Sequence, residues 1–136
     1  MNASLLLVAD FANIDSGGKL NVIGVFNRIS ARTFPTVHPV MYLVVRLVAE
    51  LGDFDVQHQL RVILQDQDEH AIWETPEITF AMQSPPDGSL GEFTPIIGIQ
   101  NLQFEQPGRY FFRVLVDKDP KGTVPIEVVQ IASEAQ

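Results

Sequence analysis

Short stretches of alternating apolar and polar residues, separated by glycine and proline, are the feature that most constrains this chain. Residues 56–64 are the clearest example: alternate positions carry Val56, His58, Leu60, Val62 and Leu64, and most positions between them are polar. In an extended strand such residues point to one face. Nine glycines and nine prolines interrupt these stretches at short intervals. The period of two predicts β-strands and no convincing helix.

The spacing of these stretches predicts about eight strands, joined by turn-forming segments. They are expected at 4–10, 19–29, 40–50, 56–64, 71–82, 94–104, 109–117 and 123–131. Pro76 breaks the fifth stretch, and the strands at 40–50 and 56–64 are expected to pair as a long hairpin. Because about eight strands are too many for one small sheet, we expect two packed sheets, an all-β antiparallel sandwich.

Length, charge and cysteine content limit the class of protein. The chain has 136 residues, 46% of them hydrophobic, which predicts a single domain over 1–136 with 132–136 as a frayed tail. A formal charge of −8 makes nucleic acid and anionic membranes poor partners. No signal peptide or membrane span is recognisable, so a cytoplasmic location is expected. The absence of cysteine excludes disulfides and a thiolate nucleophile.

A turn followed by a tyrosine-bearing strand gives the most specific local motif. Pro107 and Gly108 form the turn, and Tyr110 is the first inward residue of the strand that follows. The motif resembles the tyrosine corner of immunoglobulin-like and fibronectin-like sandwiches, in which the phenol hydrogen-bonds upstream backbone. The resemblance implies an immunoglobulin-like fold. It concerns architecture and not antibody-type function, because the chain lacks the cysteine pair.

A second resemblance covers most of the chain. It rests on Ala9-Asp10-Phe11-Ala12, the segment 18–26 (GKLNVIGVF), Phe34-Pro35, His38-Pro39 and the Pro-Gly-x-Tyr motif. Together these segments resemble an uncharacterised family of small bacterial proteins, classed as a domain of unknown function. The resemblance implies a bacterial, cytoplasmic origin and no known activity, and it assigns no catalytic or ligand-binding residues.

Catalytic motifs are absent from the sequence. The nucleophile-elbow, zinc-protease and phosphate-binding glycine patterns do not occur, and the three histidines are scattered. We therefore predict no catalytic residues and no enzymatic activity. His58 is expected to be a hydrogen-bonded histidine near a strand end, because it lies on an inward face between apolar residues.

The aspartates suggest an alternative function. If consecutive strands run antiparallel, alternate connections share one end of the sandwich, and calcium takes about six to eight oxygen ligands from such loops. The candidate metal ligands are Asp10, Asp53, Asp55, Asp117 and Asp119. The competing interpretation is that aspartate is simply a common turn residue, so that no cofactor is bound. The opposite end, which includes Asp66, Asp68 and His70, is expected to be an ordinary solvated rim.

Apolar residues also occupy strand faces that the alternation assigns to solvent. Either the chain's own loop 28–39 or 83–93 covers them, or they form a contact surface. The candidate interface residues are Tyr42, Val44, Arg46, Phe111, Arg113 and Leu115. Because homo-oligomers are usually two-fold symmetric, a dimer is expected, with another protein as the alternative partner. The sequence thus predicts a non-enzymatic interaction or structural module that self-associates; the alternative is a Ca²⁺-dependent ligand-binding module.

Overall fold

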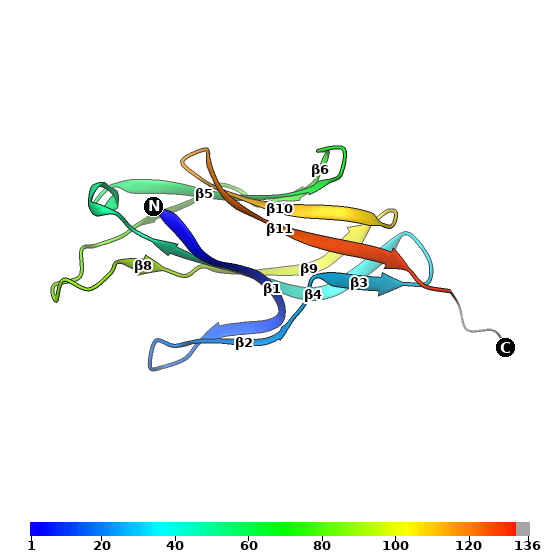
Figure 1. Cartoon of the computed structure of the whole chain (residues 1–136), viewed down its shortest axis with the longest axis horizontal. Coiled ribbons are helices and arrows are strands. Elements are labelled where there is room, and N and C mark those ends of the chain that lie inside the picture. The colour runs from blue at the N-terminus through cyan, green and yellow to red at the C-terminus, as the bar shows by residue number, and fades with distance from the viewer. Residues whose placement is uncertain (133–136) are drawn as a thin grey trace.

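Eleven β-strands in two stacked sheets make up nearly all of the computed structural model, which describes residues 1–132 (Figure 1). Sheet A contains β1 (Asn2–Ile14), β2 (Leu20–Val25), β4 (Thr36–Val48), β8 (Glu92–Phe93) and β9 (Ile96–Phe104). Sheet B contains β3 (Arg28–Ala31), β5 (Gln57–Asp66), β6 (Ala71–Glu74), β7 (Ile78–Ala81), β10 (Gly108–Val116) and β11 (Asp119–Gln130). A single turn of 3₁₀ helix, η1 (Leu51–Asp53), lies between β4 and β5. From residue 133 onward, the expected frayed tail is outside the described residues.

The all-β prediction is confirmed, but the expected number of about eight strands was too low. The stretch 19–29 divides into β2 and β3, because the chain crosses there from sheet A to sheet B. The stretch 71–82 divides at Pro76 into β6 and β7, which both pair with β5. Proline cannot donate a hydrogen bond to the ladder, so it separates the two short strands.

The predicted hairpin between 40–50 and 56–64 is wrong. β4 pairs with β1, β8 and β9 in sheet A, whereas β5 pairs with β6, β7 and β10 in sheet B. Residues 49–56 carry the chain from one sheet to the other. Both strands turn one face into the same core, so their alternation is the same whether they pair side by side or stack face to face.

The strand pairing also departs from the purely antiparallel sandwich that was expected. β3 runs parallel to the end of β11, because it enters sheet B directly after β2 of sheet A. The immunoglobulin-like topology is not confirmed. At the β9–β10 connection, the hydroxyl of Tyr110 donates to the backbone carbonyl oxygen of Gln106, four residues upstream.

The core lies between the sheets and is formed by the inward faces of the long strands. Met41 and Leu43 of β4 face Leu60 of β5 and Phe112 of β10, and all four side chains are fully buried. The ring of Trp73 packs edge-on against Phe112, with 6.1 Å between the ring centroids. This packing fixes which face of each strand is left for solvent or for partners.

Two neighbouring phenylalanines on β10 test this sidedness. Phe112 is fully buried and Phe111 is half-buried on the outer face of sheet B. Phe112→Ala should reduce the free energy of unfolding by about 3–5 kcal/mol, because it leaves a cavity that the two sheets cannot close. Phe111→Ala should cost less than half as much, as measured by urea unfolding followed by circular dichroism. Equal losses would contradict the assignment of the two faces.

Candidate functional site

His58 lies at the start of β5 on the inward face, and only 5% of its surface is exposed. Its Nδ1 is 2.7 Å from Oδ2 of Asp117, and its Nε2 is 2.8 Å from the backbone carbonyl oxygen of Asp53. A carbonyl oxygen and an ionised carboxylate oxygen can only accept hydrogen bonds, so this geometry favours the form of the His58 ring that carries a proton on both nitrogens. The two contacts agree with the expected hydrogen-bonded histidine and occupy both ring nitrogens.

Asp117 fastens the turn between β10 and β11 to β5. Asp117 and Lys118 have φ angles of 52° and 67°, the left-handed pair of a tight two-residue hairpin turn. Oδ1 of Asp117 accepts the backbone N–H of Gln59, while Oδ2 accepts from His58. The hydrogen bond from His58 is the main reason that the pKa of Asp117 is lowered. Conversely, the Asp117 carboxylate and then the Asp53 carbonyl raise the pKa of His58, against the opposing effect of burial.

Asp53 connects a third segment, η1, to His58 and Asp117. Its Oδ2 lies 2.8 Å from the terminal ammonium group of Met1 and accepts the backbone N–H of Glu50, and both contacts lower its pKa. We call Asp53, His58 and Asp117 the His58 cluster. It holds together η1, the start of β5 and the β10–β11 turn, so its geometry is that of a structural joint.

The candidate metal ligands are spread more widely than the sequence suggested. Asp53 and Asp117 meet at His58, but Asp119 pairs with Nζ of Lys121 at 2.9 Å and Asp10 lies on β1, beside Gly24. Within residues 1–132, the five aspartates form no group of three ligand atoms within 4.8 Å of one another. Calcium binding stays a prediction.

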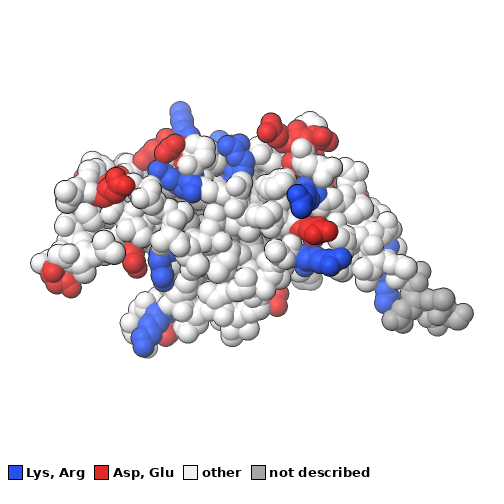
Figure 2. All heavy atoms as spheres, viewed as in Figure 1, with Lys and Arg blue, Asp and Glu red and all other residues white. Residues whose placement is uncertain are grey.

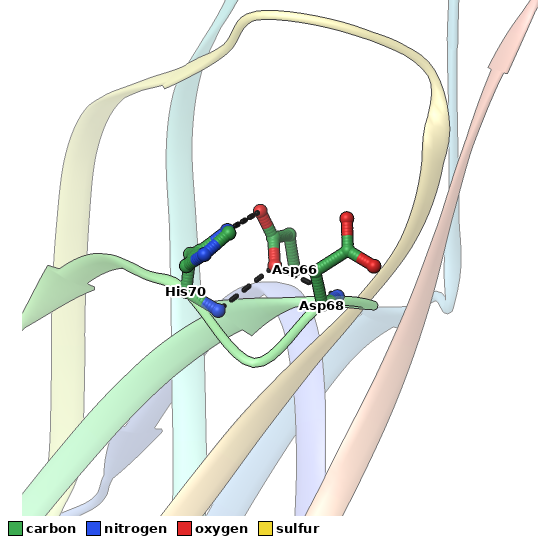
Figure 3. Close-up of side chains that lie close together, drawn as sticks. All are labelled: Asp66, Asp68 and His70. Atoms are coloured by element: carbon green, nitrogen blue, oxygen red, sulfur yellow. Dashed lines mark hydrogen bonds and ion pairs between the residues drawn. The ribbon is translucent and has the colours of Figure 1, made fainter.

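Asp66, Asp68 and His70 form the group of three potential ligands that does meet this distance (Figure 3). They lie in the β5–β6 turn, at the end expected to be a solvated rim. Oδ1 of Asp66 accepts the backbone N–H groups of Asp68 and His70, each at 2.9 Å, and its Oδ2 lies 3.4 Å from Nδ1 of His70. These backbone bonds are typical of an aspartate that shapes a tight turn, which accounts for the cluster.

The candidate interface residues lie on opposite sides of the sandwich, which corrects the single surface that was expected. Tyr42, Val44 and Arg46 are on β4, at the outer face of sheet A. The other three candidates lie on β10 at the outer face of sheet B: Phe111, Arg113 and Leu115. Val44 is fully buried because Leu7 of β1 and Ile96 of β9 flank it on the same face.

The apolar surface of sheet A is wider than the sequence indicated, because β1 and β2 contribute to it. Residues directly opposite each other in an antiparallel ladder share a face, and Phe11 pairs with Ile23 while Ala9 pairs with Val25 and Tyr42. We define the sheet A face by its apolar members, Leu5, Leu7, Ala9, Phe11, Ile23, Val25, Val40, Tyr42, Val44 and Ile96. A signal existed in the sequence: the alternation in 5–11 and 21–25 has apolar residues on both faces.

Parts of both loops expected to cover this face are strands of the sheets instead. Residues 28–31 belong to β3 of sheet B, and residues 92–93 form β8, which extends sheet A beside β4. Exposure remains high at Ile23 (63%), Val25 (62%), Phe11 (43%) and Val40 (40%). Figure 2, which views the sandwich from the side, shows charges of both signs along the upper side over sheet B and an uncharged area in the middle of the lower half, with charged groups at its borders.

The raised pKa of His58 predicts a pH-dependent stability. A folded-state pKa above the ordinary value of 6.5 gives stability that is fully present below that value and is lost as pH rises through the folded pKa. The free energy of unfolding should therefore fall on the alkaline side in urea titrations run from about pH 5.5 to about pH 9. At the acidic end of this range, His58→Gln should cost about 1.5–3 kcal/mol, because it removes charged hydrogen bonds.

In the His58→Gln variant, this alkaline loss should disappear. His70→Gln is the matched control, because the His70 side chain is 77% exposed, and it should keep the profile of the wild type. The same pH profile in wild type and His58→Gln would show that His58 is not the titrating group.

Comparison with known proteins identifies the family of this chain and a solved structure with a similar fold. None of the curated proteins matches this chain, and residues 1–132 contain no helix that could serve as a transmembrane segment. The fold is similar to that of Pseudomonas fluorescens alkylpurine DNA glycosylase AlkC bound to DNA containing an abasic site analog, with a TM-score of 0.53 and 11% sequence identity. That likeness covers 93% of this chain but only 30% of the glycosylase chain, and it concerns the fold alone. Residues 4–129 match the model of a family of unknown function, as the sequence motifs suggested, and the chain therefore belongs to that family, DUF6941.

Proposed function

We propose that this protein is a non-enzymatic interaction module of the bacterial cytoplasm that forms a two-fold dimer through the sheet A face. The observation that carries the proposal is a wide apolar face that remains exposed in a strongly acidic chain. Monomeric proteins rarely leave a contiguous apolar patch of this kind uncovered. Ile23 and Val25, each more than 60% exposed, lie at its margin on the edge strand β2.

A second copy of the chain fits this face better than a charged partner does. In a two-fold dimer the same patch meets itself, so a patch with net charge would repel its own copy. With a formal charge of −8, two copies of this chain repel each other in most relative orientations. Arg46, at the border of the face, lies 3.9 Å from Glu92, which offsets its charge. The sheet A face is thus where two copies can come together without opposing like charges.

The dimer is tested with two substitutions on β2. Light scattering coupled to size exclusion should give the mass of a dimer for the wild type at micromolar concentrations. Ile23→Lys combined with Val25→Lys should raise the dissociation constant at least about 100-fold, since each buried aliphatic side chain contributes about 1.5–3 kcal/mol. The variant should remain folded, because both side chains are exposed in the monomer.

Leu51→Lys combined with Leu90→Lys is the matched control. These leucines are 94% and 72% exposed and lie outside the sheet A face, so the pair adds the same charge elsewhere. A monomeric wild type at all concentrations, or equal effects of the two double variants, would contradict the proposal. Assembly that appears only with millimolar calcium would favour the alternative, a calcium-dependent module using the loop aspartates.

A further inference from the structure

We propose that the outer face of sheet B binds an extended peptide with an acidic residue at its centre and an apolar residue two positions before and two positions after it. This face is on the opposite side of the sandwich from the sheet A face, so the inference does not depend on the proposed dimer. Three features carry it: two hollows, the spacing of the two β10 residues that border them, and an arginine that lies between those residues.

The first hollow has a volume of about 510 Å³ and lies beside β5. Ile63 of β5 and Leu115 of β10 are its apolar lining, and Arg61 and Lys118 also border it. The Arg61 guanidinium is paired with the Glu74 carboxylate, with 2.5 Å between Nη2 and Oε2. The volume is sufficient for one aliphatic or aromatic side chain of a partner.

The second hollow has a volume of about 300 Å³ and lies on the other flank of β10, beside β11. Phe111 and Pro125, which are directly opposite each other in the ladder, line it, together with Arg109. Leu115 of the first hollow and Phe111 of the second are four residues apart on β10, or about 13 Å at ~3.3 Å per residue. Side chains at positions i and i+4 of an extended peptide have the same separation, so a short segment lying along β10 places them over Leu115 and Phe111, each at the border of its hollow.

Arg113 lies midway between Phe111 and Leu115 on the same face. It is half-buried, with Ile63 and Thr123 as its direct neighbours across the ladder. Among residues 1–132, no carboxylate lies within ion-pair distance of its guanidinium. A partly desolvated guanidinium without a counter-ion favours a carboxylate, which it can bind through two parallel hydrogen bonds.

The charges around the two hollows favour the central position for the acidic residue of the peptide. In each hollow the acidic and basic lining residues are equal in number: Glu77 and Asp117 with Arg61 and Lys118 in the first, and Glu127 with Arg109 in the second. Neither hollow therefore has an excess of positive charge that would favour a carboxylate, and an apolar side chain needs none. The pattern that fits is therefore apolar, any, acidic, any, apolar.

The test uses a capped pentapeptide, Leu-Ser-Glu-Ser-Leu, titrated into the ¹⁵N-labelled protein and followed by NMR. The amide signals of Phe111, Arg113 and Leu115 should shift and saturate. The peptide Leu-Ser-Gln-Ser-Leu should bind the wild type about tenfold more weakly, since it lacks the charged hydrogen bonds to Arg113. Arg113→Gln should weaken binding of the glutamate peptide to a similar extent, and Arg113→Lys should restore part of it.

Arg46→Gln is the matched control, because it removes the same charge from the outer face of sheet A and should leave the affinity unchanged. The titration is repeated on the Ile23→Lys, Val25→Lys variant, so that failure of the dimer and failure of peptide binding are scored separately. Equal affinity for the glutamate and glutamine peptides would overturn the proposal. So would shifts on another surface, or no saturable shift at millimolar peptide.

Discussion

Burial of one face of each long strand between the two sheets is the constraint on which the rest of this structure depends. β4, β5, β9 and β10 supply the largest of the fully buried side chains, and their close packing determines which face of each strand points inward. The outward faces are a consequence of this packing. Tyr42 and Arg113 are therefore separated by the thickness of the sandwich, although both lie on outward positions of apolar strands.

The ends of the sheets need a different kind of interaction, because turns cannot bury enough apolar surface. The His58 cluster provides it at one end, where the ring of His58 bridges the backbone carbonyl oxygen of Asp53 in η1 and the carboxylate of Asp117 in the β10–β11 turn. At the other end, Asp66 shapes the β5–β6 turn through backbone N–H groups. Asp53 and Asp117, which the sequence offered as metal ligands, and Asp66, which it assigned to a solvated rim, thus act as hydrogen-bond acceptors for the chain itself.

The two outer faces have different chemistry, and this difference leads to different proposed partners. The sheet A face is defined by apolar side chains, several of them exposed, which suits contact with an identical surface. The outer face of sheet B mixes apolar hollows with Arg61, Arg113 and Lys118, which suits a partner that carries both apolar and acidic groups. One sandwich can therefore hold two independent contacts on opposite sides, as its layered shape in Figure 1 allows.

The sequence by itself determined the all-β class, most strand positions, the break at Pro76 and the inward position of His58, because period-two alternation and proline are local signals. Only the tertiary structure decided which strands share a sheet: β4 and β5 have the same alternation but lie in different layers. That assignment separated Tyr42 from Phe111 and brought Asp53 and Asp117 to His58. Alternation records which residues face the core, and it holds no information on which strand lies beside which, since both layers bury the same kind of face.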